Sequence, residues 1–214
     1  TQEFLDKANQ ITSAFIEMRV KTQDKIALIT SANRTELSIF DMGILQFGGV
    51  TVPLYPTISS ADYEYILNHS ESAYCVISDE EIYNKVFSIK NKVKGLKDIY
   101  SFERINGCKH WSELLSLGEK KLNKKKLKKV KSNVSPEDLA TIIYTSGTTG
   151  NPKGALISQK GIMSLIANGM NNLGPFDPNA VNLVCMPLFH IAGSAWLFFG
   201  LASGCKNILL VDIN

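Results

Sequence analysis

The sequence lacks the features that define several large classes of protein. It has no uninterrupted apolar run long enough to span a bilayer, and no basic segment followed by an apolar one, as in a signal peptide. Its formal net charge is only +3, which gives no general attraction to nucleic acid. It contains neither a Gly-x-Ser-x-Gly elbow nor a paired cysteine–histidine motif, so hydrolase and thiol chemistry are poor fits.

Cysteine is scarce and scattered. The four cysteines, Cys75, Cys108, Cys185 and Cys205, have neither the spacing of a metal site nor that of a disulfide framework. Cys75 and Cys185 fall in apolar, strand-like runs. We therefore expect reduced thiols in or near the core, which fits a cytoplasmic location.

What is present is the pattern of an α/β protein. Of the 214 residues, 44% are hydrophobic, which is enough for a sizeable core. Helical spacing of apolar residues alternates along the chain with short strand-like runs, and this indicates a mostly parallel sheet covered by helices. The expected strands lie at 24–30, 50–54, 73–78, 98–102, 139–144, 181–186 and 207–211, and the expected helices at 4–18, 37–47, 59–68, 80–92, 161–173 and 190–203.

One segment has a strongly biased composition: Lys120–Lys131 contains eight lysines and no acidic residue. Its leucines are too sparse for a helix anchored in a core, so we interpret about 118–136 as a Lys-rich, solvated linker. The alternative is a surface that attracts anionic lipid head groups or an acidic partner. Peripheral contact with a membrane is therefore left open.

The most informative stretch is Tyr144–Gly154, which reads Tyr-Thr-Ser-Gly-Thr-Thr-Gly-Asn-Pro-Lys-Gly. Its glycines let the backbone approach a ligand, its hydroxyls can donate hydrogen bonds to phosphate oxygens, and Lys153 adds a positive charge. The expected strand before it places it where ligands bind in open α/β sheets. We interpret it as a phosphate-binding loop, because an ordinary surface turn rarely combines so many hydroxyls with a lysine.

This loop differs from a Walker A motif. Pro152 stands where that motif has its second glycine, and Gly154 stands where it has Ser or Thr. Because Pro152 also removes a backbone donor, we expect side-chain hydroxyls to bind phosphate together with backbone amides.

The stretch Tyr144–Gly154 resembles the signature loop of the adenylate-forming superfamily, which comprises acyl-CoA synthetases, adenylation domains of peptide synthetases and firefly-type luciferases. The block Met186–Ser194 is similar to the acyl-pocket motif of that family, with its aromatic–histidine pair. Asn33–Glu36 and Val52–Ile58 resemble the acyl-CoA ligase branch, especially its long-chain members. The resemblance covers nearly the whole chain.

The resemblance implies roles for individual residues. Lys153 would stabilise the charge on the triphosphate, and Thr149 would help to place Mg²⁺. His190, Phe189 and Gly193 would line the carboxylate and acyl pocket, with His190 and Lys153 taking part in catalysis. From the residues alone, His190 is more often a structural histidine, and Phe189 also fits a core position. The loop residues that would bind ATP are Thr145, Ser146, Gly147, Thr148, Thr149, Gly150 and Lys153.

Other polar residues have no implied catalytic role. His69 and His110 lack a pattern of partners and are expected to be structural or exposed. Glu36 is expected to pair locally with Arg34.

The function implied by the resemblance is that of a fatty acid–CoA ligase, which uses ATP to form acyl-AMP and then transfers the acyl group to coenzyme A. The alternatives are an adenylation enzyme with a carrier-protein thiol as acceptor, and a non-catalytic nucleotide-binding fragment. The family's ribose block, hinge and terminal lysine are not found. Residues 1–214 are therefore expected to be a partial N-terminal domain, inactive alone, with further residues upstream of Thr1.

The two blocks point to different acids. The stretch from Asn33 to about Val86 resembles the long-chain branch, whereas Met186–Ser194 resembles the medium-chain and aryl-acid branches. We expect an apolar monocarboxylic acid, fatty rather than aromatic, with the chain length and the oligomeric state undecided.

Overall fold

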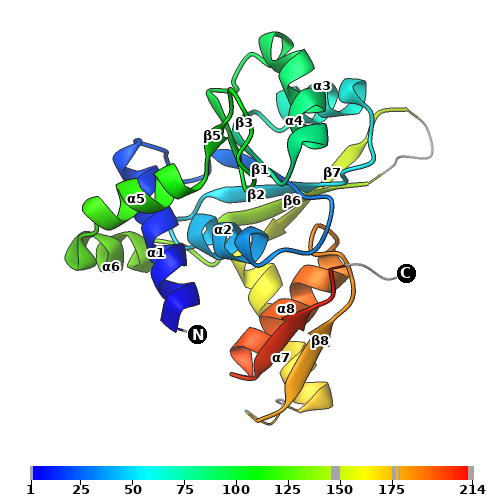
Figure 1. The fold of residues 1–214 in the computed structure, drawn as a ribbon. Helices are drawn as coiled ribbons and strands as arrows, with labels where there is room; N and C mark the ends of the chain where they lie inside the picture. Colours follow the sequence, from blue (N-terminus) through cyan, green and yellow to red (C-terminus); the bar gives the residue numbers. More distant parts are fainter. Residues whose placement is uncertain (1, 146–149, 175–176, 178, 212–214) are drawn as a thin grey trace.

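The computed structural model describes residues 2–145, 150–174, 177 and 179–211. Its main layer is a seven-stranded sheet in the order β5-β4-β3-β1-β2-β6-β7, while β8 and β9 form a separate parallel pair (Figure 1). Neighbouring strands of the main sheet are parallel except β6 and β7, which confirms the expected α/β fold. The strands are β1 Lys25–Ile29, β2 Val50–Leu54, β3 Ser72–Ile77, β4 Asp98–Ser101, β5 Lys109–His110, β6 Leu139–Thr145, β7 Lys153–Ser158, β8 Val181–Val184 and β9 Lys206–Leu209.

Helices cover both faces of the main sheet, and each face has its own apolar core. Side chains alternate along β1, so that Ile26 and Leu28 pack with α1 and α2, while Ala27 and Ile29 pack with α3 and α4. The helices are α1 Gln2–Glu17, α2 Thr35–Leu45, α3 Ser60–His69, α4 Glu80–Ile89, α5 Ser112–Lys120, α6 Lys124–Ser132, α7 Gln159–Leu173 and α8 Ile191–Ala202, with a 3₁₀ turn at Lys90–Lys92.

Most expected elements are present within a few residues of their expected bounds. Ser59 and Asp62 form a capping box at the start of α3, with Ser59 Oγ accepting from Asp62 N at 3.1 Å. Two strands were not expected: the short β5 and the edge strand β7. Because β7 begins at Lys153, the end of the expected phosphate loop is the second strand of a hairpin.

The Lys-rich segment was expected to be a solvated linker whose leucines are too sparse to anchor a helix, and the second part of this expectation is wrong. Residues Lys124–Ser132 form helix α6, whose start is capped by Asn123 through a hydrogen bond from Lys126 N. Leu127 is buried and Val130 is partly buried against the core that includes α1. Lysine and leucine are both good helix formers, so the helix needs few apolar contacts to pack against the protein. The contacts of Leu127 and Val130 are sufficient here.

All four cysteines are free thiols, as expected. Cys75 and Cys205 are buried, whereas Cys185 is exposed just beyond the end of β8, outside the core. Within the described residues, none of the helices has the length and apolar character needed to cross a membrane.

Candidate functional site

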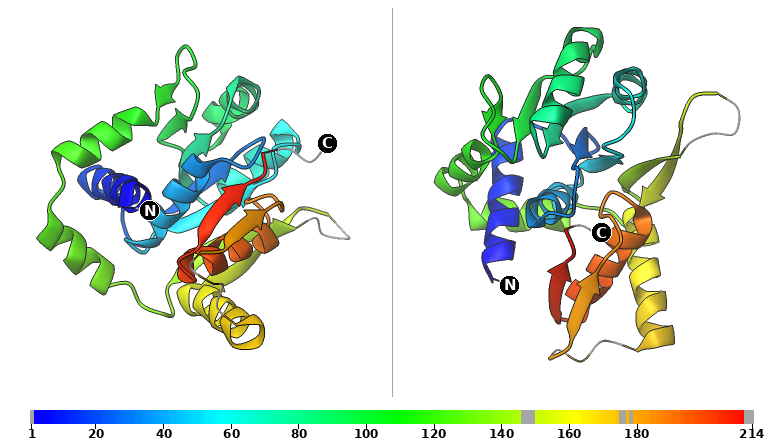
Figure 2. Two further views of the ribbon diagram at one scale, coloured as in Figure 1. Left: turned by 60° about the horizontal axis from the view of Figure 1, so that its bottom comes forward. Right: turned by 45° about the vertical axis from the view of Figure 1, so that its right-hand side comes forward.

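The β6–β7 hairpin presents the glycine- and hydroxyl-rich stretch at one edge of the sheet. Because β6 runs parallel to β2, its end at Thr145 lies at the carboxyl edge of the parallel strands. Thr145 is paired with Lys153 across the hairpin, whose strands extend outward from the sheet (Figure 2). The four candidate residues Ser146, Gly147, Thr148 and Thr149 lie outside the described residues.

Tyr144 anchors the base of this hairpin. Its ring is buried, and its hydroxyl lies 2.7 Å from Nδ1 of His69, which in turn stacks on Tyr65. Burial raises the pKa of Tyr144 to about 12, with a further contribution from Tyr65, so the hydroxyl stays protonated at neutral pH. A Cβ atom at Gly154 would lie 2.8 Å from Cγ2 of Ile142 and 3.2 Å from the Tyr144 ring, so glycine allows the close approach. His69 is thus structural, as expected.

Lys153 and Gly150 flank the undescribed residues. Lys153 is exposed, and no acidic side chain in the described part of the chain pairs with it. Gly150 has φ of 100°, a value that L side chains rarely adopt. A free ammonium group beside a backbone that requires glycine is compatible with binding an anion.

His190 and Phe189 lie directly before α8. His190 is the N-cap of this helix: its Nδ1 accepts a hydrogen bond from Ala192 N at 3.2 Å. The neutral imidazole therefore has its proton on Nε2, which is left to donate to a ligand. Phe189 packs edge-on against Tyr55 with 4.9 Å between ring centroids and is only partly buried.

Asn33 holds this segment in place, a role that the sequence did not reveal. Its buried side chain donates to the carbonyl oxygens of Met186 (3.1 Å) and Leu210 (3.0 Å) and accepts from the backbone N–H of Leu188 (2.8 Å). These partners lie more than 150 residues away in sequence. The block Asn33–Glu36 was noticed only as a family resemblance, because no local pattern could connect it to Met186–Ser194.

Gly193 is buried in the first turn of α8. A Cβ atom there would lie 2.2 Å from the carbonyl oxygen of Pro187 and 2.6 Å from that of Met186. The glycine therefore lets α8 pack directly on the preceding segment. A contact between Gly193 and a substrate stays a prediction.

An apolar cavity of about 300 Å³ lies between the main sheet and helices α2, α7 and α8. Leu188, Ile191 and Ser194 lie in its wall, so the cavity adjoins the segment that contains Phe189 and His190. A cavity of this size and lining is typical of small-molecule sites. Its other apolar walls come from Leu28, Leu37, Pro53, Ile143, Ile157, Ile162, Leu165, Ile166, Ala195 and Phe198.

One carboxylic acid, Asp41 of α2, lies in the wall of this cavity. Burial raises its pKa from 3.8 to about 6, although a hydrogen bond with Thr51 acts in the opposite direction. The folded state thus binds the proton more tightly than the unfolded state does. Protonated Asp41 stabilises the fold below about pH 4, and that stabilisation is lost as the pH rises through about 6.

Replacing Asp41 by asparagine should therefore remove a pH dependence of stability. Between about pH 4 and pH 7.5, the free energy of unfolding of the wild type should fall relative to that of Asp41→Asn by up to about 3 kcal/mol. Urea unfolding of both proteins across this range measures the difference, with the exposed Asp6→Asn as the control. Parallel pH profiles for wild type and Asp41→Asn would show that Asp41 titrates normally.

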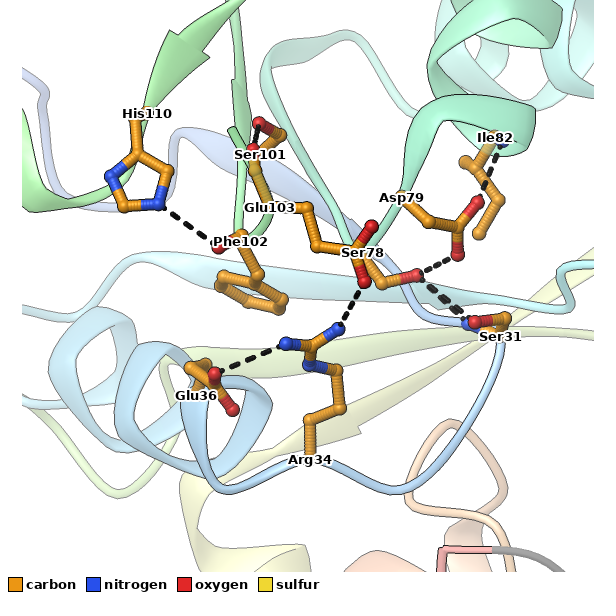
Figure 3. A network of polar contacts seen from close by, with 10 residues as sticks. All are labelled: Ser31, Arg34, Glu36, Ser78, Asp79, Ile82, Ser101, Phe102, Glu103 and His110. Atoms are coloured by element: carbon orange, nitrogen blue, oxygen red, sulfur yellow. Dashed lines mark hydrogen bonds and ion pairs between the residues drawn. The ribbon is translucent and has the colours of Figure 1, made fainter. Parts of the chain in front are cut away.

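A polar network joins the ends of β1 and β3 at the same carboxyl edge (Figure 3). Ser31 N donates to Ser78 Oγ at 3.0 Å, and Ser78 Oγ donates to Asp79 at 2.5 Å. Asp79 also caps α4 by accepting from Ile82 N at 3.1 Å. Although burial alone would raise the pKa of Asp79, these hydrogen bonds hold it below its ordinary value. The network is structural, because its members bind one another.

Arg34 extends this network. Its guanidinium lies 3.3 Å from Glu36, the expected local pair, and 3.1 Å from Glu103 beyond β4 (Figure 3). His110 contacts Ser112 at 2.7 Å and the carbonyl oxygen of Phe102 at 3.0 Å, so its expected structural role is confirmed. Among the described residues, no group of three or more His, Cys, Asp or Glu side chains could hold a metal ion.

The chain is similar in sequence to curated acyl-CoA synthetases and to a peptide synthetase. Fatty acyl-CoA synthetase A of Dictyostelium discoideum is 29% identical over 86% of this chain and 28% of its own length. Long chain acyl-CoA synthetase 4 of Arabidopsis thaliana is 30% identical over 89% of this chain and 30% of its own length. Tyrocidine synthase 1 of Brevibacillus parabrevis is 29% identical over 98% of this chain and 17% of its own length. The chain thus spans less than a third of each of these relatives.

Two solved structures share the fold. A putative long-chain-fatty-acid CoA ligase from Rhodopseudomonas palustris matches the whole chain with a TM-score of 0.87 and 19% identity, over 51% of its own length. An anthranilate CoA ligase in complex with anthranoyl-AMP matches 99% of this chain with a TM-score of 0.86 and 22% identity, over 40% of its own length. The family model described as AMP-binding enzyme matches residues 2–213, so the chain belongs to this adenylate-forming family.

Proposed function

We propose that this chain is part of the N-terminal, ATP- and acyl-binding domain of a fatty acid–CoA ligase. The observation that supports this most is the apolar cavity of about 300 Å³ beside Phe189 and His190. An apolar cavity suits an alkyl chain, and His190, which lies in sequence between the wall residues Leu188 and Ile191, could donate a hydrogen bond from Nε2 to a carboxylate.

In the first step, a carboxylate oxygen of the acid attacks the α-phosphorus of ATP. The bond from that phosphorus to the bridging oxygen of pyrophosphate breaks, which leaves acyl-AMP and pyrophosphate. Lys153, together with Thr145, Ser146, Thr148, Thr149 and the backbone at Gly147 and Gly150, would hold the leaving pyrophosphate. Their task is electrostatic, since charge builds up there in the transition state.

In the second step, the thiolate of coenzyme A attacks the acyl carbon and AMP leaves. His190 Nε2 would orient the carboxylate in the first step by donating a hydrogen bond to it. Mg²⁺ shares the neutralisation of the phosphate charge in such reactions and commonly needs few protein ligands besides the phosphates. Thr149 is our candidate for that contact, because the resemblance to the adenylate-forming loop implies this role.

A carrier-protein thiol is the second candidate acceptor. It is favoured by the similarity to tyrocidine synthase 1, which extends over 98% of this chain. Coenzyme A is preferred because the two other relatives are acyl-CoA synthetases. For the acid, a fatty chain is preferred to an aryl ring. We place the protein in the cytoplasm with peripheral membrane contact.

The test uses a full-length form of the protein. In this form the 214 residues are part of a longer chain, as the matching region is in the relatives. ATP, Mg²⁺, a panel of fatty and aryl acids and coenzyme A should give acyl-CoA, detected by mass spectrometry. The 214 residues alone should give none above background, because catalysis requires all holding groups in place. Acyl-AMP that is trapped by hydroxylamine but never passed to coenzyme A would favour the carrier-protein alternative.

Phe189→Ala should shift the preference of the full-length form toward bulkier acids. The ring is only partly buried and directly follows the wall residue Leu188, so its removal would give a bulkier acid more room if the proposed pocket extends to it. Each additional buried methylene contributes about 0.8 kcal/mol, so kcat/KM ratios between acids should change by several-fold. Phe87→Ala, at an exposed position on α4, is the control. An unchanged ranking of acids would place Phe189 in the core and not in the pocket wall.

A further inference from the structure

Helix α6 presents an unusual concentration of charge. The segment Lys120–Lys131 has eight lysines and no acid, while the whole chain has a net charge of only +3, so the remaining residues are together negative. Positive charge is therefore gathered on one element. Lysines four residues apart, as in Lys124/Lys128 and Lys125/Lys129, repel one another on a helix. No acidic residue within Lys120–Lys131 offsets this repulsion.

The orientation of α6 is set by its apolar side. Leu127 is buried and Val130 is partly buried, and Lys131 Nζ donates to Asn9 of α1 at 2.7 Å. With this side against the protein, the helical period directs Lys125, Lys128 and Lys129 outward and places Lys124 at the margin, and all four are exposed. None of these four forms an ion pair with a described residue; the nearby Lys121 pairs with Glu17 at 3.4 Å.

An apolar groove adjoins this cationic helix. It has a volume of about 580 Å³ and begins at Lys131, and its walls include Leu5 of α1, Met163 of α7 and Leu201 of α8. Leu5 and Met163 are 44% and 61% exposed. A cationic rim beside exposed apolar side chains is the combination found on surfaces that bind membranes.

The chemistry of α6 favours a lipid surface over other polyanions. Lysine is a hydrated point charge that attracts a field of head groups, whereas reading individual phosphate groups commonly uses the planar fork of arginine, which α6 lacks. The helix also has no aromatic side chain on which a nucleic-acid base could stack. We propose that the outward lysines of α6 dock the protein on an anionic bilayer, with the apolar groove facing the lipid. This docking does not depend on the proposed ligase activity.

Cosedimentation with vesicles tests the proposal. The purified chain should bind vesicles of equal parts phosphatidylcholine and phosphatidylglycerol, and it should not bind phosphatidylcholine alone. Raising the ionic strength from about 0.1 M to about 1 M shortens the Debye length from about 10 Å to about 3 Å and should release it. Changing Lys124, Lys125, Lys128 and Lys129 together to glutamine should weaken binding at least tenfold, or about 1.4 kcal/mol.

A matched variant changes Lys90, Lys92, Lys94 and Lys97 to glutamine, with the same loss of charge near the start of β4. It should retain most of the binding. Glutamine preserves helix propensity, so circular dichroism should show both variants folded. Equal losses in the two variants would mean a response to net charge only, and the proposal would be wrong. It would also be overturned if the wild type bound neutral vesicles equally well, or bound polyglutamate or DNA but no vesicles.

Discussion

Replacing Lys153 by alanine in the full-length form is expected to lower the rate of ATP–pyrophosphate exchange by at least about tenfold. Lys153 is exposed at the start of β7, opposite Thr145, with no acidic partner among the described residues. Its ammonium group is therefore free to contact the triphosphate. Loss of a charge-assisted hydrogen bond costs about 1.5–3 kcal/mol, and 1.4 kcal/mol corresponds to one decade in rate.

The control is Lys160→Ala, which removes an exposed lysine of α7 that forms an ion pair with Glu137 at 3.6 Å. It should leave exchange within about twofold of wild type, because an isolated surface ion pair contributes little. Acid binding, measured separately by calorimetry, should be unaffected by Lys153→Ala, since the lysine is not part of the cavity wall. Normal exchange in Lys153→Ala would remove Lys153 from the phosphate site.

Asn33→Ala is expected to destabilise the fold by at least about 2 kcal/mol. The change removes three hydrogen bonds at once and leaves the carbonyls of Met186 and Leu210 and the N–H of Leu188 without this partner. Each buried polar group left unpaired costs about 1–3 kcal/mol. Urea unfolding of the purified chain measures the effect.

The control for this change is Asn91→Ala, at an exposed position in the 3₁₀ turn. It should alter stability by less than about 0.5 kcal/mol. In the full-length form, Asn33→Ala should also raise the KM for the acid, because Asn33 positions the segment that leads to His190. Stability equal to that of wild type would show that other contacts hold Met186–Ser194 in place.

The local elements follow from local chemistry, and here the sequence was informative. The alternation along Lys25–Ile29 and the capping box at Ser59 depend only on near neighbours, so they could be recognised without the fold. The glycines and hydroxyls of Tyr144–Gly154 also form a local pattern, and the phosphate-binding loop that they indicate stays a prediction.

The predictions of secondary structure failed where contacts between residues far apart in sequence determine the local conformation. Lys124–Ser132 was taken for a linker, but contact with α1 through Leu127 and Val130 makes it a helix. Lys153 and Gly154 were taken for the end of a loop, but pairing with β6 makes them the start of the edge strand Lys153–Ser158. In both cases, tertiary contact outweighs a weak local pattern.

By itself, the sequence determined the α/β class, the order of most elements and the residues that resemble an adenylate-forming loop. Only the tertiary structure showed that Asn33 joins the start of the chain to Met186–Ser194, that Asp41 lies in the wall of an apolar cavity, and that the lysines of α6 share one exposed face. The physical reason is the separation in sequence of the residues that determine each feature. Helical and strand periodicity are set by residues a few positions apart, whereas a buried amide, a cavity and a charged face are made by side chains that only folding brings together.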